Sequence, residues 1–257
     1  MLKGKTIVVT GVGPGLGGEV ARCAFRDGAN VVIAARTKER LVEFAKELDS
    51  SGKRVAYKET DITQRDQVKQ LADVAVDRFG GIDGLVHVAA FLGTINKFLD
   101  IPVEEFRNAC EMNIVGTAGM LQVIVPYMQD KGGSIVLIGS QSSFAPTVEQ
   151  SAYGVSKGGA VTLTYYLAKE LGTYGIRVNA VVPSWMWGPA VEGYVQIAAA
   201  EQRVSEADVK SFLAARFPVN RIPTDDDVAE VAVFLCSDRA RSVDGQSILV
   251  NGGEFMR

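Results

Sequence analysis

Residues 6–17 read Thr6-Ile7-Val8-Val9-Thr10-Gly11-Val12-Gly13-Pro14-Gly15-Leu16-Gly17, an apolar β-branched run followed by a glycine-rich turn. The apolar run predicts a buried strand, and the residues after Gly15 have the pattern of a helix. A glycine-rich turn between strand and helix lets the backbone approach a pyrophosphate, while the helix N-terminus supplies N–H groups and a partial positive charge. The stretch therefore predicts the start of a dinucleotide-binding α/β sheet. A P-loop is excluded because no Gly-Lys-Ser/Thr sequence follows.

The same alternation of apolar runs and helical stretches continues along the chain. Strands are expected at Thr6–Thr10, Asn30–Ala34, Arg54–Tyr57, Gly84–Val88, Ser134–Ile138, Arg177–Val182 and Ser247–Val250. Helices are expected at Gly15–Asp27, Lys38–Ser50, Gln64–Phe79, Val103–Met128, Ala152–Thr173 and Asp225–Cys236. Short, continuously apolar strands alternating with helices are typical of a parallel sheet covered on both faces. The pattern predicts an α/β, Rossmann-like, doubly wound and mainly seven-stranded parallel sheet.

One segment, Pro183–Pro223, breaks this rhythm. About forty residues between the sixth strand and the last helix are too many for a plain connection. Residues 184–222 are therefore expected to form a small inserted helical lid over the substrate site. No linker, repeat or low-complexity tract divides the chain, so residues 1–257 are interpreted as one catalytic domain.

Composition excludes several classes of protein. The 257 residues are 47% hydrophobic and 22% charged with net charge −3, which is typical of a soluble domain and argues against a general nucleic-acid binder. No apolar run approaches the ~20 residues of a membrane span, and the N-terminus does not resemble a signal peptide. Cys23, Cys110 and Cys236 lie far apart, which favours reduced thiols in the cytoplasm. His87 is the single histidine, so a His-rich metal site is excluded and no metal is expected.

Candidate catalytic residues lie on three separate segments. Tyr153 and Lys157 are four residues apart on a predicted helix and hence share a face. Such a pair alone is more often part of a solvated surface. Ser140, at the end of the fifth strand, adds a third polar group that the fold can bring to the same point. Asn113 lies in the middle of a predicted helix, where an Asn has no propensity advantage.

Together these motifs resemble the short-chain dehydrogenase/reductase family: Thr10-Gly-x-x-x-Gly-x-Gly17, Asn113, Ser140 and Tyr153-x-x-x-Lys157, in that order and at that spacing. The resemblance covers essentially the whole chain. It implies a nicotinamide cofactor and hydride transfer between a carbonyl and an alcohol, with Tyr153 as general acid/base. It further implies that Ser140 orients the substrate oxygen, that Lys157 holds the nicotinamide ribose and that Asn113 helps to place a water. From charge alone, the Lys157 ammonium is expected to favour the Tyr153 phenolate.

The end of the second strand bears on cofactor choice. An acidic residue there commonly binds the ribose 2′-hydroxyl of NAD, but this chain has Ala35 followed by Arg36. A guanidinium can bind a 2′-phosphate, and Thr37 adds a hydroxyl, so NADP(H) is preferred and NAD(H) is the alternative. An ion pair between Arg36 and Glu39 is the competing interpretation. The remaining cofactor-binding residues implied by the resemblance are Gly11, Gly15, Leu16, Gly17, Asp61, Ile62, Ala89, Tyr153, Lys157 and Pro183.

Two departures from the family pattern concern the cofactor site. The usual Asn-Asn-Ala-Gly after the fourth strand is His87-Val88-Ala89-Ala90, where His87 is expected to be a hydrogen-bonded core residue. Five residues after Pro183, where a Thr often contacts the nicotinamide carboxamide, this chain has Gly188. An apolar alcohol or ketone substrate is expected. Its pocket is predicted from Gln141, Phe144, Trp185, Trp187 and Tyr194, although the aromatic residues also suit lid packing or an oligomer contact.

Two other functions stay open at this point. A 3-oxoacyl-[acyl-carrier-protein] reductase would need a basic docking surface near the site entrance. A non-catalytic nicotinamide sensor would not need the proton donor that Tyr153 provides. The resemblance also implies a homotetramer formed through the helices that contain Asn113 and Tyr153, where Gly158-Gly159-Ala160 permits close packing.

Overall fold

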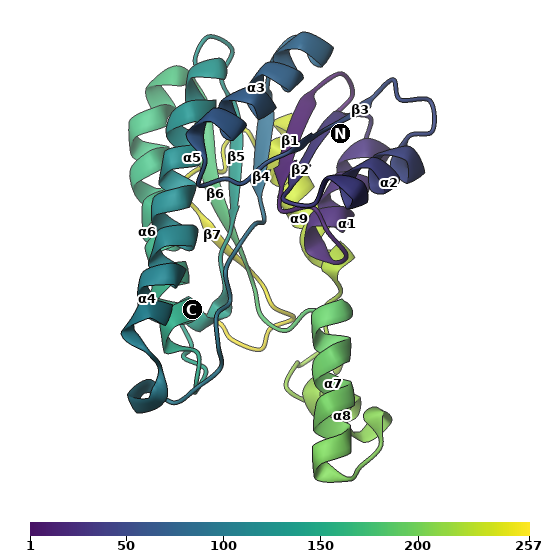
Figure 1. Cartoon of the computed structure of the whole chain (residues 1–257), viewed down its shortest axis with the longest axis vertical. Coiled ribbons are helices and arrows are strands. Elements are labelled where there is room, and N and C mark those ends of the chain that lie inside the picture. Colours follow the sequence, from purple (N-terminus) through teal and green to yellow (C-terminus); the bar gives the residue numbers. More distant parts are fainter.

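Seven parallel strands form one sheet in the computed structural model, which describes all residues 1–257 (Figure 1). Their order is β3-β2-β1-β4-β5-β6-β7, so the chain winds outward from β1 in one direction and then in the other. The predicted doubly wound α/β fold is confirmed. The strands are β1 (Thr6–Thr10), β2 (Asn30–Ala35), β3 (Val55–Glu59), β4 (Gly84–His87), β5 (Gly133–Ile138), β6 (Ile176–Pro183) and β7 (Ser247–Val250).

Helices cover both faces of the sheet (Figure 1). One face carries α1 (Leu16–Arg26), α2 (Lys38–Leu48) and α9 (Asp225–Cys236), and the other carries α3 (Arg65–Phe79), α4 (Val103–Cys110), α5 (Thr117–Ile124) and α6 (Ser151–Leu171). Two separate apolar clusters fill the two layers, with Val9 in the first and Val8 in the second. Adjacent residues of β1 are therefore buried on opposite faces, which is why the strand is apolar throughout.

The helix predicted as one run over Val103–Met128 is interrupted. A π-helical segment, Glu111–Gly116, separates α4 from α5, and a 3-10 turn, Val125–Tyr127, ends the run. The extra residue per turn of a π-helix rotates the residues that follow, and such segments are frequent at functional sites. Asn113 lies inside the segment.

This helical run, Val103–Tyr127, is also long and apolar enough to cross a membrane, since an 18-residue stretch within it has a mean hydropathy of 1.2, with 44% of that stretch buried in the protein. Its apolar character has a local cause. Met120, Leu121 and Ile124 are buried in the second cluster against the sheet.

The inserted segment forms two helices, α7 (Pro189–Gln202) and α8 (Glu206–Ala214), which project beyond the carboxyl ends of the strands (Figure 1). They have their own small apolar cluster, which includes Val195, Leu213 and Phe217. A capping box between Ser205 and Asp208 fixes the start of α8. The lid is thus a packed unit that can present a rigid wall to the site.

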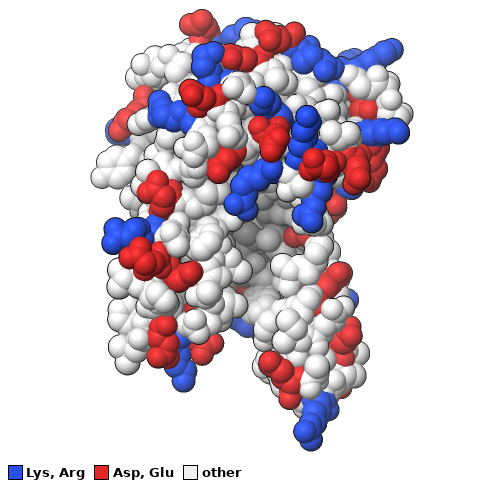
Figure 2. Space-filling model, viewed as in Figure 1, with Lys and Arg blue, Asp and Glu red and all other residues white.

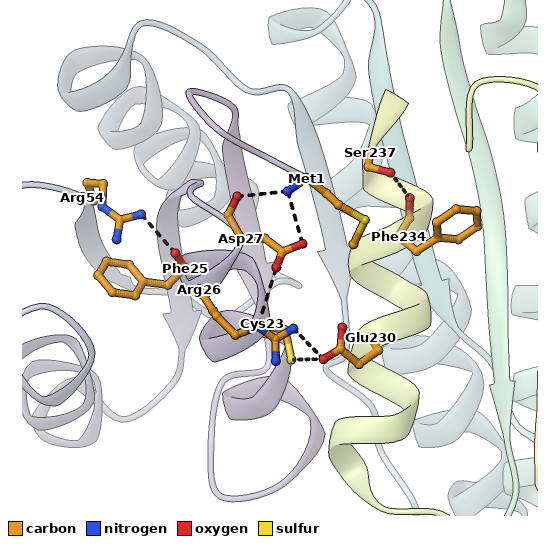
Figure 3. A network of polar contacts seen from close by, with 9 residues as sticks. All are labelled: Met1, Cys23, Phe25, Arg26, Asp27, Arg54, Glu230, Phe234 and Ser237. Atoms are coloured by element: carbon orange, nitrogen blue, oxygen red, sulfur yellow. Dashed lines mark hydrogen bonds and ion pairs between the residues drawn. The ribbon is translucent and has the colours of Figure 1, made fainter. Parts of the chain in front are cut away.

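A partly exposed set of polar contacts joins α1 to α9, and Figure 3 shows those of Cys23 and Arg26 with Glu230. The Cys23 thiol donates to Asp226 over 3.2 Å, and Arg26 forms an ion pair with Glu230. Cys23, Asp226 and Glu230 bring three potential metal ligands within 4.8 Å of one another. Burial, however, raises the pKa of the Cys23 thiol to about 12, so the sulfur is protonated at neutral pH. The cluster is therefore explained as an interhelical contact whose members satisfy one another.

Candidate active site

A cavity of about 350 Å³ opens at the carboxyl ends of the strands, between the sheet and the lid. Figure 2 shows a hollow on this face, above the lid, with Lys and Arg side chains along its upper border. Its walls come from the glycine-rich turn after β1, the loop after β5, the start of α6, the loop after β6 and the start of α9. The lining residues are Pro14, Gly15, Leu16, Leu92, Ser140, Gln141, Ser142, Thr147, Gln150, Tyr153, Ser184, Trp185, Met186, Gly188, Pro189, Ala190, Val191, Arg216 and Asp225.

The glycine-rich turn presents the N-terminus of α1 to this cavity. Gly15 occupies the N-cap with φ +108°, and no side chain caps the first turn. The N–H groups of Leu16 and Gly17 are thus available to an anion, whereas the Gly18 N–H donates to the carbonyl oxygen of Gly15 over 3.0 Å. The turn is held tightly, since a Cβ at Gly17 would lie 2.2 Å from the carbonyl oxygen of Gly11. This cradle fits the pyrophosphate of a dinucleotide.

Ser140 and Tyr153 meet on the opposite wall. Ser140 follows β5, and its hydroxyl is bonded to the Ser142 hydroxyl over 2.9 Å and accepts from the Ser142 amide over 3.3 Å. The phenol of Tyr153, in the first turn of α6, lies on the same wall, near enough to the Ser140 hydroxyl to act on the pKa of Tyr153. Both residues line the cavity. The structure therefore brings together two hydroxyl groups that the sequence separates by one loop.

Lys157 lies one helical turn beyond Tyr153, in the buried layer behind the cavity. Its ammonium donates to the carbonyl oxygen of Ile138 over 2.7 Å and stands 5.8 Å from the centroid of the Tyr153 ring. Burial lowers the pKa of Lys157 to about 8. Burial also raises the pKa of Tyr153, and the neighbouring Ser140 hydroxyl opposes that rise. The direction is opposite to the one expected from the Lys157 charge, because loss of hydration outweighs an attraction to an ammonium that is itself destabilised.

Asn113 holds the neighbouring loop. Its side-chain amide donates to the carbonyl oxygen of Phe91 over 2.8 Å and to the Ser156 hydroxyl over 2.9 Å, while its amide oxygen accepts from the Phe91 N–H over 2.7 Å. Both amide protons are used, and the residue does not line the cavity. The Asn113 side chain therefore joins the loop after β4 to α6 next to Lys157, and the placement of a water by Asn113 stays a prediction.

His87 connects three elements through a buried chain of hydrogen bonds. Its Nδ1 lies 2.7 Å from the Thr10 hydroxyl, and its Nε2 lies 3.0 Å from the Thr117 hydroxyl. Thr117 in turn donates to the carbonyl oxygen of Asn113 over 3.0 Å, so we assign the imidazole proton to Nε2. Burial, and secondly the Lys157 charge, lower the pKa of His87 to about 3. This neutral imidazole is a structural residue that ties the glycine-rich turn to the π-helical segment.

The other residues implied for the cofactor line the same edge of the sheet, outside the cavity itself. Arg36 is exposed at the end of β2 and forms no ion pair with Glu39 or any other acid. Thr37 is the N-cap of α2, but its hydroxyl makes no capping bond. Asp61 accepts from the Thr63 amide and hydroxyl over 2.9 and 2.8 Å. Of the remaining three residues, Ile62 follows β3 and is buried, and Pro183 is the buried last residue of β6. Ala89 follows β4 and is half-buried against the glycine-rich turn.

Only two of the five predicted pocket residues line the cavity. Gln141 does so with its amide bonded to Asn251 over 2.6 Å and to Glu254 over 3.1 Å, and Trp185 does so beside the lid. The structure places the other three elsewhere. Phe144 packs near β6 under the Arg257 guanidinium, Trp187 joins the lid cluster under Lys210, and Tyr194 packs against Trp185 with ring centroids 4.9 Å apart.

The cavity also contains residues that the sequence analysis missed. Leu92, Met186 and Val191 add apolar walls, and Arg216 enters from the lid, where it is ion-paired with Glu254. Asp225 is the least expected of them. Its place directly after Thr224 at the start of a helix is that of an ordinary first-turn acid, and no spacing signal relates it to the glycine-rich turn.

This combination defines a class of protein. An uncapped helix N-terminus after β1, an exposed guanidinium after β2 and a Ser/Tyr/Lys set beside one cavity are the parts of a nicotinamide-dependent α/β oxidoreductase.

Comparison with known proteins identifies the family. Residues 11–254 match the family model described as "Enoyl-(Acyl carrier protein) reductase". The chain is 30% identical over 253 residues to 7alpha-hydroxysteroid dehydrogenase of Escherichia coli, covering 98% of this chain and 94% of that protein. It is 32% identical over 262 residues to L-rhamnose 1-dehydrogenase (NAD(P)(+)) of Azotobacter vinelandii, covering 100% and 98%. The chain belongs to the short-chain dehydrogenase/reductase family.

Solved structures agree with this assignment. The structure of a single-residue variant of actinorhodin polyketide ketoreductase with NADPH superimposes with a TM-score of 0.87 at 29% identity, covering 99% of each chain. Levodione reductase superimposes with a TM-score of 0.89 at 27% identity, covering 99% of this chain and 98% of that one.

Proposed function

We propose that this protein is an NADP(H)-linked oxidoreductase that interconverts a secondary alcohol and a ketone, with Tyr153 as general acid/base. One observation carries the proposal. The hydroxyls of Ser140 and Tyr153 line the same cavity as the uncapped N-terminus of α1, with the buried ammonium of Lys157 one turn behind. That arrangement supplies a proton at the point where a dinucleotide on the glycine-rich turn can exchange a hydride.

The chemistry follows from where charge develops. A bound nicotinamide would supply a hydride to the carbonyl carbon of a ketone, or would accept a hydride from the carbinol carbon of an alcohol. In the reducing direction the carbonyl oxygen becomes negative, Ser140 stabilises it by a hydrogen bond, and Tyr153 donates its phenolic proton. In the oxidising direction the phenolate takes that proton back. Burial raises the pKa of Tyr153, so the phenol is neutral at neutral pH and can donate its proton in the reducing direction.

The test of the catalytic assignment is Tyr153→Phe. This change removes one oxygen and keeps the ring, so we expect turnover to fall by at least ~10³-fold because the proton donor is lost. The variant is expected to retain dinucleotide binding, which is measured by the quenching of Trp185 fluorescence. Full activity of the variant with any substrate of the wild type would overturn the assignment.

The preference for NADP(H) is supported by the unpaired guanidinium of Arg36 and by the absence of a carboxylate at Ala35. Arg36→Ala is expected to weaken NADPH binding by about tenfold or more and to leave NADH binding nearly unchanged, since a charge-assisted bond contributes about 1.5–3 kcal/mol. Lys53→Ala, at the opposite edge of the sheet, is a matched control for lost surface charge. Equal effects of Arg36→Ala on both cofactors would mean that Arg36 is a surface residue with no role in cofactor preference.

An apolar or alicyclic small molecule is the proposed substrate, because apolar side chains face the catalytic hydroxyls: Leu92, Trp185, Met186 and Val191. The one cation there, Arg216, is ion-paired with Glu254. A hydroxysteroid dehydrogenase among the relatives supports the same class. A screen of alicyclic and charged ketones with NADPH tests this, and a preference for phosphorylated substrates would contradict it.

A 3-oxoacyl-[acyl-carrier-protein] reductase is the second candidate, supported by such a reductase from Thermotoga maritima at 30% identity. An acidic carrier protein requires a basic surface at the site entrance. The lid, residues 184–222, has four basic and four acidic side chains, which gives no net positive charge. We therefore rank free ketones above acyl-carrier substrates. Measuring turnover of an acyl thioester and of free ketones distinguishes these two substrate classes. The third candidate, a non-catalytic sensor, is disfavoured by the complete Ser/Tyr/Lys set.

We also propose a homotetramer. Val115, Val155 and Tyr166 are apolar residues with 54%, 58% and 65% of their surface exposed, on the π-helical segment and on α6. Gly159 allows close packing inside the subunit, because a Cβ there would lie 2.5 Å from Ile114. Gly158 faces open space and is free to pack against another subunit. Light scattering after gel filtration tests the assembly, and a monomer at micromolar concentration would contradict it.

A further inference from the structure

One carboxyl group in the cavity has no partner. Asp225 is the first residue of α9 and is only 9% exposed, yet its side chain makes no hydrogen bond or ion pair within the protein. It lines the cavity together with Gly15 and Tyr153. Buried carboxyls are normally paired, because an isolated charge loses its hydration. An unpaired one that faces a ligand cavity is a candidate for contact with the ligand.

The carboxyl group of Asp225 occupies the space that a side chain at position 188 would fill, since residue 188 is a glycine. A Cβ at Gly188 would lie 2.1 Å from Oδ2 of Asp225 and 2.8 Å from its Cγ. Any larger residue at that position would therefore collide with the carboxyl group. The same Oδ2 lies 3.2 Å from the Cβ position of Gly15, the N-cap of α1. The carboxyl thus stands between the turn that begins α1 and the loop that begins α7.

The backbone holds Asp225 in this place. Residues Trp187 and Thr224 pair as an isolated parallel bridge, in which the Trp187 N–H donates to the carbonyl oxygen of Pro223 over 2.7 Å. Thr224 and Asp227 form a capping box at the start of α9. The bridge and the capping box therefore fix the position of Asp225 without using its carboxyl group. The carboxyl group is consequently preorganised for a ligand.

We propose that Asp225 is a dinucleotide-contacting residue, which replaces the side chain missing at Gly188 and makes the affinity for the dinucleotide dependent on pH. This inference rests on the proposed nicotinamide-linked function. A neutral carboxyl has one donor and one acceptor, which complements a primary carboxamide or a phosphate oxygen. An ionised carboxylate can only accept, and it repels a phosphate held at the N-terminus of α1.

The charges around Asp225 favour its neutral form. Burial raises its pKa to about 6, and Glu19 on α1 and Glu192 on α7 also act to raise it. Arg216, which enters from the lid side, is ion-paired with Glu254, and Tyr153 on α6 is uncharged at neutral pH. A negatively charged ligand raises the pKa of Asp225 again, and by linkage a rise of about one pKa unit makes binding about tenfold tighter in acid than in alkali.

The experiment is a titration of the wild type and of Asp225→Asn with NADH and NADPH between pH 5.5 and 8.5, followed by tryptophan quenching. NADH is included because it has no 2′-phosphate, a group that itself titrates near pH ~6. For the wild type we expect NADH affinity to fall by about tenfold from pH 5.5 to pH 8. For Asp225→Asn we expect a profile that is flat from pH 5.5 to pH 7 and tighter binding than the wild type at pH 8. Above pH 7 the titration of Lys157, whose pKa is about 8, is common to both proteins and cancels in the comparison.

Two further variants separate contact from structure. Asp226→Asn removes a carboxylate from the same turn of α9, one that faces Cys23 instead of the cavity, and is expected to behave as the wild type. Gly188→Thr alone is expected to weaken binding through its collision with Asp225, and Gly188→Thr with Asp225→Ala is expected to restore it without the pH dependence. Melting temperatures of all variants verify folding.

The outcomes distinguish the inference from the function on which it rests. Coincident pH profiles for the wild type and Asp225→Asn, with binding intact in both, would overturn the role of Asp225 alone. Failure of the wild type to bind either dinucleotide at any pH would overturn the proposed function and this inference with it.

Discussion

His87→Gln isolates the cost of keeping a neutral imidazole in the centre of the sheet. In the folded protein the pKa of His87 is lowered to about 3, from an ordinary value of 6.5. In the unfolded chain the imidazole takes up a proton below about pH 6.5, so the free energy of unfolding must fall as the pH falls through that range. The slope is about 1.4 kcal/mol per pH unit, which amounts to about 3 kcal/mol at pH 4.

The glutamine variant lacks this acid-dependent loss. Its amide keeps one acceptor for Thr10 and one donor for Thr117, so we expect it to be only about 1–2 kcal/mol less stable at pH 7.5. Urea unfolding at pH 7.5, 6, 5 and 4, at equal protein concentration, gives both stability curves. Carboxylates titrate alike in the two proteins and cancel in the difference. The curves should converge or cross towards pH 4, and a difference that stays constant within about 0.5 kcal/mol across the range would refute a buried neutral imidazole.

Three other substitutions test separate parts of the structure. Gly17→Ala places a Cβ 2.2 Å from the Gly11 carbonyl oxygen, so we expect lost dinucleotide binding and a stability loss above ~2 kcal/mol, measured by titration and urea unfolding. Lys157→Met removes a buried ammonium whose pKa is lowered to about 8, and we expect a higher melting temperature at pH 7 with turnover abolished; a variant that is both active and less stable would contradict this. Ser205→Ala removes the cap of α8, and we expect about 1 kcal/mol of lid stability to be lost, seen as faster proteolysis within the lid, with dinucleotide affinity unchanged.

The sheet and the catalytic hydroxyls could be predicted because their signals are local. Five consecutive β-branched residues over Thr6–Thr10 are compatible with a strand buried on both faces and with little else. Ser140 at the end of β5 and Tyr153 at the start of α6 meet because one short loop joins them. Where one connection fixes the geometry, residue spacing carries the information.

The lid and Asp225 could not be predicted, because their geometry depends on contacts between distant segments. An aromatic side chain such as Trp187 suits a pocket wall and a packed cluster equally, and only the pairing of α7 with α8 decides between them. Asp225-Asp226-Asp227 has the composition of an ordinary helix start, where acids favour the dipole. The bridge between Trp187 and Thr224 places Asp225, the first of these acids, at the cavity. This pairing joins two segments that are far apart in the sequence, so no hydrophobic periodicity in the sequence predicts it.

The titratable groups at this edge of the sheet share one physical condition. Burial lowers the pKa of Lys157 and His87 and raises the pKa of Tyr153 and Asp225, so each group is pushed towards its neutral form. At pH 7 these values still leave Lys157 mostly protonated and Asp225 mostly ionised, because about 8 and about 6 lie on either side of that pH. Both groups therefore titrate close to neutral pH, where an incoming dinucleotide, which carries negative phosphates and in its oxidised form a positive ring, changes their protonation. Proton uptake and cofactor binding are therefore expected to be linked in this protein, with Asp225 as the group beside the start of α1 through which the linkage acts.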